Sequence, residues 1–259
     1  MPPNLINATM KTAIIVGATS GIGREVAISL VLEGWNVGLA GRRIELLNKL
    51  RDQYGHERVH VAAIDVSSSE ACGALDALLA ETGAPDLFLH VAGIGNQNKE
   101  LDVEKEISII RTNCEGMVRM VDHFVNYVRN NRELYRDKPA RVAVVTSIAG
   151  TRGMGTAPAY SASKSMQSTY LSALSQLVRM EDIPVRFTDI RPGFVDTEIL
   201  NSSKKYPMLM TRKQAACHIL KGLSKQKRVV IFDGRYRLLV ALWRLVPLWL
   251  WERMVRVTN

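Results

Sequence analysis

The chain has 259 residues, and 47% of them are hydrophobic, which is enough to bury a substantial core and excludes a generally disordered protein. Its net charge of +9 is unevenly spread. The residues from 201 onward carry 13 Lys and Arg against 2 Asp and Glu, whereas the first 200 residues carry 21 against 23. An anionic partner is therefore expected to meet the C-terminal fifth of the chain.

The cysteines exclude two further kinds of protein. Cys72, Cys114 and Cys217 are odd in number and widely spaced, and no Cys-x-x-Cys pair or Cys/His cluster occurs. This pattern argues against a disulfide framework and against a zinc site, so no metal is expected. A reducing, cytoplasmic compartment is expected for the same reason.

Residues 1–10 are polar and lack the apolar stretch of a signal peptide, so they are expected to form a flexible extension. Seven short apolar runs follow, separated by segments long enough for crossover helices. Several runs are apolar on both faces, which is typical of strands in a buried parallel sheet. The runs are 12–17, 35–41, 58–65, 86–93, 141–147, 184–190 and 228–234.

The alternation of strands and helices predicts one doubly wound α/β domain over residues 11–234, with a seven-stranded parallel sheet. Residues 235–259 are expected to add a basic, Trp-rich helical extension to the same domain. No repeat or linker divides the chain.

The first run leads directly into a glycine-rich turn, which marks the fold as a Rossmann type. Its glycines allow a tight turn and a close approach to a pyrophosphate, and the following helix supplies free amides and the positive end of its dipole. At a strand-to-helix turn this pattern indicates a dinucleotide site. The candidate residues are Gly17, Thr19, Ser20, Gly21, Ile22 and Gly23.

The residues at the end of the second run are expected to decide whether the site prefers NAD or NADP. NAD-binding folds usually place a carboxylate there for the ribose hydroxyls. Here the chain has Arg42 and Arg43 instead. Guanidinium groups suit a 2′-phosphate, so NADP(H) is expected as the cofactor. In the alternative interpretation, the two arginines cap a solvated helix beside Glu45.

The stretch YSASK, residues 160–164, places a phenol and an ammonium four residues apart. On a helix these positions share one face. An ammonium near a phenol lowers the phenol's pKa, and a shift from about 10 to about 7 requires roughly 4 kcal/mol. Tyr160 would then act as a proton donor with its pKa lowered by Lys164. In the alternative interpretation the two residues are an ordinary surface pair, and the rest of the sequence must decide between them.

These motifs occur together in an order that resembles the short-chain dehydrogenase/reductase family over about residues 11–234. The matching residues and motifs are GATSGIG at 17–23, Asp65 at the end of the third run, the Ala-Gly pair at 92–93, Asn113, Ser147, YSASK at 160–164 and RPGFVDT at 191–197.

The resemblance implies a role for each of four catalytic positions. Tyr160 would be the general acid in reduction and the base in oxidation. Lys164 would lower the pKa of the tyrosine and bind the nicotinamide ribose. Ser147 would hydrogen-bond the substrate oxygen, and Asn113 would hold a water that links Lys164 to solvent.

The same resemblance extends the cofactor site beyond the glycine turn and the arginine pair. Asp65 would contact the adenine, and the segment from Pro192 to Thr197 would cover the nicotinamide. The further cofactor contacts implied are Asp65, Val66, Ala92, Gly93, Tyr160, Lys164, Pro192, Gly193, Val195 and Thr197.

Two positions depart from the family pattern. Val16 stands where the family commonly has Thr, and His90-Val91 stands where it commonly has two asparagines. Both changes remove side-chain hydrogen bonds that brace the site. We expect them to alter stability or cofactor affinity rather than the type of reaction.

The segment from Phe194 to about Leu223 is expected to set substrate specificity. Its apolar residues suit an adaptable lid over an apolar or lipid-like carbonyl compound. Lys204 and Lys205 either meet an anionic group or are solvated. The lid candidates are Ile199, Leu200, Tyr206, Met208, Leu209 and Met210.

Residues 235–257 combine three tryptophans with flanking arginines, and their apolar stretches are shorter than the roughly 20 residues that span a bilayer. One interpretation is a lid over the cleft or a subunit interface. The other is a peripheral membrane contact.

The resulting hypothesis is an NADP(H)-dependent oxidoreductase that interconverts a small-molecule carbonyl and its alcohol. One alternative is a 3-oxoacyl-carrier-protein type reductase, with the basic C-terminal region docking the acidic carrier. Another is a non-catalytic nucleotide-sensing protein of the same fold. Nucleic acid is not expected as a partner. The resemblance implies a homodimer or homotetramer paired through helices near 100–130 and 158–180.

Overall fold

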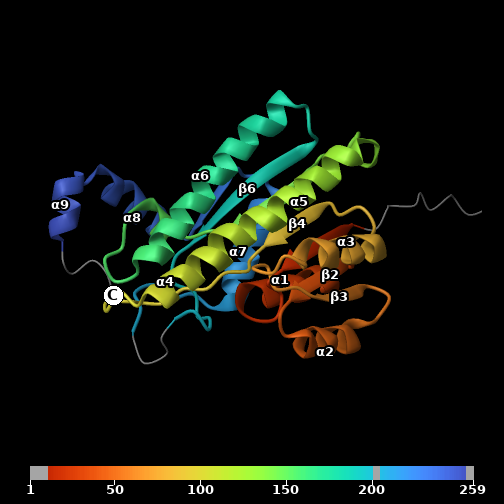
Figure 1. Cartoon of the computed structure of the whole chain (residues 1–259), viewed down its shortest axis with the longest axis horizontal. Coiled ribbons are helices and arrows are strands. Elements are labelled where there is room, and N and C mark those ends of the chain that lie inside the picture. Colours follow the sequence, from red (N-terminus) through yellow and green to blue (C-terminus); the bar gives the residue numbers. More distant parts are fainter. Residues whose placement is uncertain (1–10, 201–204, 255–259) are drawn as a thin grey trace, which may run out of the picture.

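The computed structural model describes residues 11–200 and 205–254, so the expected N-terminal extension and the last residues of the tail lie outside the described residues. The described strands form one parallel sheet in the order β3-β2-β1-β4-β5-β6-β7 (Figure 1). This confirms the expected seven-stranded doubly wound fold. The strands are β1 Thr12–Val16, β2 Asn36–Gly41, β3 Val59–Ala63, β4 Leu87–His90, β5 Ala140–Val145, β6 Val185–Pro192 and β7 Val229–Phe232.

Nine α-helices occur among the described residues, and most of them connect consecutive strands. A π-helical turn, η1, and two 3₁₀ turns, η2 and η3, interrupt the connections. The helices and turns are α1 Gly21–Leu32, α2 Ile44–Tyr54, α3 Ala71–Thr82, α4 Val103–Ile110, η1 Arg111–Glu115, α5 Gly116–Asn130, η2 Arg132–Tyr135, η3 Ile148–Thr151, α6 Pro158–Met180, α7 Arg212–Ser224, α8 Gly234–Leu245 and α9 Leu248–Arg253.

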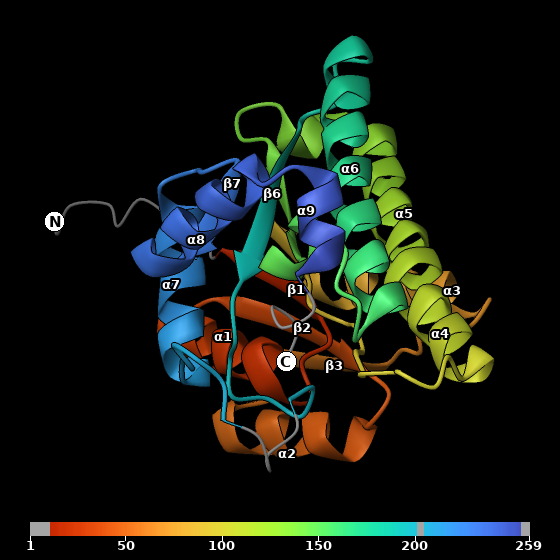
Figure 2. The same cartoon turned by 90° about the vertical axis from the view of Figure 1, so that its left-hand side faces the viewer.

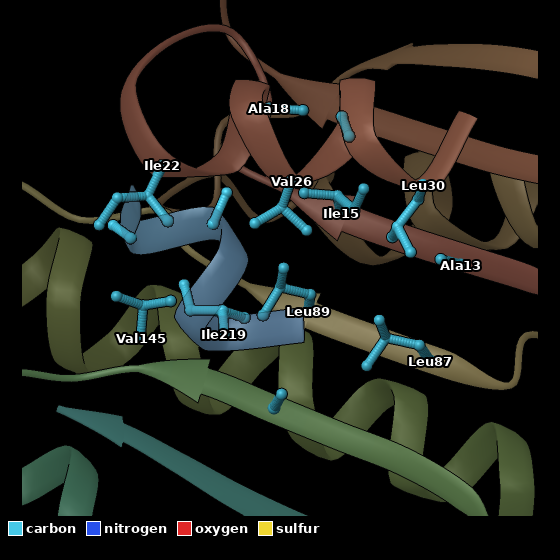
Figure 3. Packing of buried hydrophobic residues seen from close by; sticks show 14 of the residues in the cluster. Ala13, Ile15, Ala18, Ile22, Val26, Leu30, Leu87, Leu89, Val145 and Ile219 are labelled. Atoms are coloured by element: carbon cyan, nitrogen blue, oxygen red, sulfur yellow. The ribbon is translucent and has the colours of Figure 1, made fainter. Parts of the chain in front are cut away.

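Strand β1 shows why the chain forms this layered structure. All five of its residues are buried, and successive side chains point to opposite faces of the sheet. Ile15 packs into one core with Leu30 of α1 and Ile219 of α7, as Figure 3 shows. Ile14 packs into the other core with α3, α5 and α6. An apolar side chain at every position is therefore needed to bury both faces.

The carboxyl ends of the strands all lie along one edge of the sheet because every pairing is parallel. From β1 the strand order runs to β2 on one side and to β4 on the other. In open parallel sheets, ligands bind in the crevice outside the carboxyl ends at such a switch point. The expected site residues cluster at this edge.

The tail extends the molecule at one end of its longest axis (Figure 1). Helices α8 and α9 pack on η3 through a third, smaller apolar cluster that contains Ile148, Tyr236, Val240, Trp243 and Trp251. In Figure 2, α9 lies between α8 and α6. No helix within the described residues has both the length and the apolar character that crossing a membrane requires.

Candidate active site

A cleft of about 430 Å³ lies along the carboxyl ends of the central strands. It brings together residues separated by most of the chain. All the residues predicted for catalysis or cofactor binding line it except Gly23 and Asn113. The predicted residues that line it are Gly17, Thr19, Ser20, Gly21, Ile22, Arg42, Arg43, Asp65, Val66, Ala92, Gly93, Ser147, Tyr160, Lys164, Pro192, Gly193, Val195 and Thr197.

At one end of the cleft, Gly17 turns the chain from β1 towards α1. Its φ of +96° favours glycine, and a Cβ there would lie 2.6 Å from the Ala92 nitrogen. Gly23, one turn into α1, lies against the Gly17 carbonyl and supports this loop without lining the cleft. No side chain caps the first turn of α1, so its amides are available to a phosphate.

Arg43 spans this phosphate end of the cleft. One guanidinium nitrogen donates to the hydroxyls of Thr19 and Ser20, at 3.1 and 2.9 Å. The same nitrogen lies 3.3 Å from a carboxylate oxygen of Glu198, which also accepts a bond from the Ser20 hydroxyl. Both members of the ion pair are largely exposed. Arg43 therefore holds a carboxylate at the mouth of the cleft.

Asp65 lies after β3 and lines the cleft beside Val66. The hydroxyl and amide of Ser67 donate to its carboxylate at 2.6 and 2.9 Å. These bonds, together with a smaller attraction from Arg42, hold its pKa below the ordinary value. Asp65 is therefore an anionic acceptor at neutral pH.

At the other end of the cleft, Ser147 and Tyr160 meet. Ser147 follows β5 and caps η3, where its hydroxyl accepts a bond from the Ala149 amide at 3.1 Å. Tyr160 lies in the first turn of α6, which begins at Pro158. The side chain of Ser147 hydrogen-bonds the phenol and lowers its pKa, against the larger effect of burial, which raises it.

That Lys164 lowers the pKa of Tyr160 stays a prediction. Burial raises the pKa of the phenol, and the Lys164 ammonium lies 5.9 Å from the centre of its ring. The ammonium turns into the protein, where it donates to the Val145 carbonyl at 3.0 Å and to Gln167 Oε1 at 3.1 Å. Helical spacing places Tyr160 and Lys164 on one face of α6. The Val145 carbonyl and Gln167 then determine where the Lys164 ammonium points.

The buried position of Lys164 disfavours the charged form of its amine. Burial lowers its pKa to about 8, although Cys114 and Asp189 act in the opposite direction. A cation whose pKa lies this close to neutrality loses its charge readily when another positive charge approaches.

Asn113 lies in the π-helical turn between α4 and α5 and does not line the cleft. Its side-chain amide accepts from the Ile94 amide and donates to the Ile94 carbonyl, both at 2.8 Å. Its main-chain carbonyl accepts a bond of 2.7 Å from Gln167 Nε2. The Gln167 side chain thus joins Asn113 and Lys164 through hydrogen bonds, and the water-holding role of Asn113 stays a prediction.

Among the residues of the site that were not predicted from the sequence, three make contacts with predicted residues that matter for its geometry. Gln167 lies three positions after Lys164, so helical spacing could have identified it. Gly95 follows the expected Ala-Gly pair and packs against the Tyr160 ring, since a Cβ there would lie 2.6 Å from a ring carbon. Glu198 carries no motif that points to Arg43, because their contact joins residues 155 positions apart.

His90 stands where the family commonly has an asparagine. It is fully buried at the end of β4, and neither ring nitrogen has a hydrogen-bond partner among the described residues. The nearby Ala92 amide is already committed to the Val16 carbonyl. Burial, and then the positive charge of Lys164, lowers the pKa of His90 to about 3. His90 is therefore neutral at physiological pH.

Comparisons with known proteins agree with this geometry. The family model for the short chain dehydrogenase matches residues 11–207. An uncharacterized oxidoreductase from Myxococcus xanthus (strain DK1622) is 32% identical, over 92% of this chain and 93% of that protein.

Two solved structures share the fold. A short chain dehydrogenase/reductase from Burkholderia phymatum in complex with NAD has a TM-score of 0.78 at 20% identity, covering 90% of this chain and 92% of that one. A 3-ketoacyl-(acyl-carrier-protein) reductase from Brucella melitensis complexed with NADH has a TM-score of 0.76 at 23% identity, covering 86% and 97%. With the family model matching most of its length, this chain belongs to the short-chain dehydrogenase/reductase family and is an oxidoreductase of that type.

Proposed function

We propose that the protein is an NADP(H)-dependent oxidoreductase that interconverts a carbonyl and an alcohol, with Tyr160 as general acid and base. The observation that supports this proposal is the position of Tyr160. Its phenol lies beside Ser147 in the same cleft as the glycine turn and Arg43. One cleft thus holds a proton donor and a dinucleotide cradle.

The residues present fit a nicotinamide dinucleotide. Gly17 lets the chain turn tightly against the Ala92 backbone at the start of the cleft, α1 offers uncapped amides for the pyrophosphate, and Asp65 offers an anionic acceptor at the far side. When bound, this cofactor supplies or accepts the hydride. The two neighbouring structures, solved with NAD and NADH, are consistent with a nicotinamide cofactor.

The chain's own residues handle the proton. In reduction, the carbonyl carbon gains a hydride and the C–O π bond becomes an oxygen lone pair, which takes the proton of the Tyr160 phenol. The Ser147 hydroxyl stabilises the charge that develops on that oxygen. Because burial raises the pKa of the phenol, Tyr160 keeps its proton at neutral pH and is ready to donate it. Alcohol oxidation, which needs the phenolate, is therefore expected to accelerate as the pH rises.

The preference for NADP(H) rests on the residues that follow β2. Arg42 and Arg43 are exposed there, and Arg43 already binds one carboxylate. A 2′-phosphate is also an anionic oxygen ligand, and it offers a guanidinium more acceptor oxygens than a carboxylate does. Arg43→Ala is expected to weaken NADPH binding about tenfold and to leave NADH binding nearly unchanged. Equal weakening for both cofactors in fluorescence titrations would disprove this assignment.

We propose an apolar or lipid-like substrate because apolar side chains surround the reacting end. Ile94, Ile199 and Leu200 line the cleft, and Phe194 packs on Tyr206 with their ring centres 4.9 Å apart. Lys204 lies outside the described residues. Met210 is buried rather than part of a lid surface, because its amide and carbonyl tie it to Phe194 and Asp196.

The test is a screen of aldehydes and ketones of increasing chain length with NADPH, run beside Tyr160→Phe. We expect turnover to fall by at least about 100-fold in the variant, with NADPH affinity unchanged. Equal turnover would remove Tyr160 from the mechanism. NADPH binding without turnover of any carbonyl compound would favour the non-catalytic, nucleotide-sensing alternative.

A carrier-bound 3-oxoacyl substrate is the second candidate, favoured by the basic residues at the start of α7. Arg212 and Lys213 are exposed, and Arg212 contacts the cleft-lining segment through the Asp196 carbonyl at 2.6 Å. Activity on free long-chain ketones but not on carrier-bound chains would eliminate this candidate.

We also propose that the protein forms a dimer or tetramer through α4, α5 and α6. The support is apolar exposure on these helices, at Val103, Ile107 and Ile110 of α4 and at Leu177 and Met180 of α6. Light scattering of the purified protein distinguishes a monomer from either assembly.

A further inference from the structure

Helix α8 carries apolar residues on two opposite sides. Tyr236, Val240 and Trp243 recur at helical spacing and are buried. Leu238, Leu242 and Leu245 recur at the same spacing on the other side and are 62%, 56% and 79% exposed. A helix on a protein surface ordinarily has one apolar side, which faces the core. The described part of the chain leaves this second side uncovered.

Helix α9, which follows α8, also exposes apolar residues. Leu248, Trp249 and Leu250 are 61%, 58% and 39% exposed, whereas Trp251 of the same short helix is buried. Apolar residues that gather on one surface mark a contact with a protein or a membrane, while single ones are ordinary. We define this surface as the outer stripe: Leu238, Leu242, Leu245, Leu248, Trp249 and Leu250.

Buried hydrogen bonds fix the direction of the outer stripe. Trp243 Nε1 donates to the Thr151 hydroxyl at 2.9 Å, and Trp251 Nε1 donates to the Gly153 carbonyl at 2.8 Å. The Arg152 guanidinium donates to the Arg244 carbonyl at 2.9 Å. The two helices are thus fastened to η3 and to the two residues that follow it, and η3 itself is capped by Ser147. The outer stripe cannot turn inward without breaking these bonds.

The charges around the outer stripe favour an anionic partner. Residues 234–254 contain four arginines and a single acid, Glu252. All four arginines are exposed, and of the four only Arg235 has an ion-pair partner among the described residues. The guanidinium of Arg253 lies 5.5 Å from the centre of the Trp249 ring. Tryptophan and arginine at the border of an apolar surface are typical of the headgroup layer of a membrane.

We propose that the outer stripe inserts into the headgroup layer of an anionic lipid bilayer, with Arg237, Arg244 and Arg253 contacting the lipid phosphates. The helices have 12 and 6 residues, so they would lie along the bilayer rather than across it. A second copy of the chain is a poorer partner, because a self-complementary contact would gather the arginines of both copies in one interface that supplies only one acid per copy, Glu252. This proposal does not depend on the proposed reaction.

The test is flotation of the full chain with vesicles of phosphatidylcholine, with and without phosphatidylserine. The wild type is expected to float with the anionic vesicles, less so at high salt. Leu242→Asp with Leu245→Asp is expected to weaken partitioning at least about tenfold. The matched control is Leu32→Asp with Leu134→Asp, two leucines 72% and 61% exposed outside the tail, which should float like the wild type.

A charge variant keeps the test decisive if the aspartates disturb folding. Arg237→Glu with Arg244→Glu changes only exposed side chains and is expected to weaken anionic binding about tenfold while leaving NADPH binding unchanged. Wild-type protein that stays with the unbound fraction would overturn the proposal. So would a dimer that the two aspartates convert to a monomer, since a second copy would then be the partner.

Discussion

At the reacting end of the cleft, Lys164, Gln167 and Asn113 are buried and bond one another, whereas at the phosphate end Arg43 is exposed and bonds Glu198 across the mouth. Removing one partner of a buried set leaves another unsatisfied, which costs about 1–3 kcal/mol. An exposed ion pair is worth about 1 kcal/mol or less, so its members can exchange partners. The reacting end is thus built to stay fixed, and the phosphate end to change partners when an anion arrives.

The largest effect is expected from substitution of Gln167 at the reacting end. Gln167→Met keeps the size but removes both bonds, so we expect kcat/KM to fall about 10- to 100-fold and stability to fall by about 1–3 kcal/mol. Gln167→Glu keeps an acceptor for Lys164 and should recover part of the loss in kcat. Steady-state kinetics over a pH series check this. A profile that keeps its shape in both variants would mean that Gln167 does not position Lys164.

Gly95 tests whether the Tyr160 ring tolerates displacement. A Cβ at Gly95 would lie 2.6 Å from the ring, so Gly95→Ala must shift the phenol or the loop. We expect kcat to fall about tenfold, because small misplacement of a reacting group is costly. Gly155→Ala is the matched control, since a Cβ there meets nothing within 4 Å. Equal kinetics for the two variants would contradict the tight fit.

His90 differs from the other buried polar residues at the reacting end, because neither of its ring nitrogens has a hydrogen-bond partner among the described residues. Its folded pKa of about 3 lies below the ordinary value, so stability is intact above about pH 6.5. As the pH falls further, the unfolded chain takes up a proton that the folded chain refuses. The unfolding free energy should then fall by up to about 1.4 kcal/mol per pH unit, down to about pH 3.

His90→Asn removes this titration, so urea denaturation between about pH 7 and about pH 5 should give a shallower slope than the wild type. Parallel slopes for the two proteins would show that His90 binds its proton normally when folded. The other titrating groups occur in both proteins, so their contributions cancel in the difference between the two slopes.

The smallest expected effect belongs to the phosphate end. Glu198→Gln removes the carboxylate that occupies Arg43, so NADPH affinity should rise up to about fivefold while NADH affinity stays constant. Glu45→Gln removes the same charge from an exposed site on the neighbouring helix and should have less effect. Weaker NADPH binding in Glu198→Gln would show that the carboxylate supports the site rather than competing for it.

Local patterns in the sequence were sufficient for the strands, the glycine turn and the shared helix face of Tyr160 and Lys164. Alternating burial, backbone freedom and helical spacing are properties of short segments, so they can be predicted without the fold. Both sides of α8, the one with Tyr236, Val240 and Trp243 and the one in the outer stripe, are apolar in the sequence, however, and only packing against η3 decided which side is covered.

The sequence by itself determined which chemical groups reach the cleft, and the tertiary structure decided which partner each group meets. Gln167 bonds a residue 54 positions away and Arg43 one 155 positions away. Such partners depend on how the layers pack, because a buried donor takes whichever acceptor the neighbouring element places within about 3 Å. The Lys164 ammonium therefore follows the Val145 carbonyl and Gln167 rather than the phenol four residues before it.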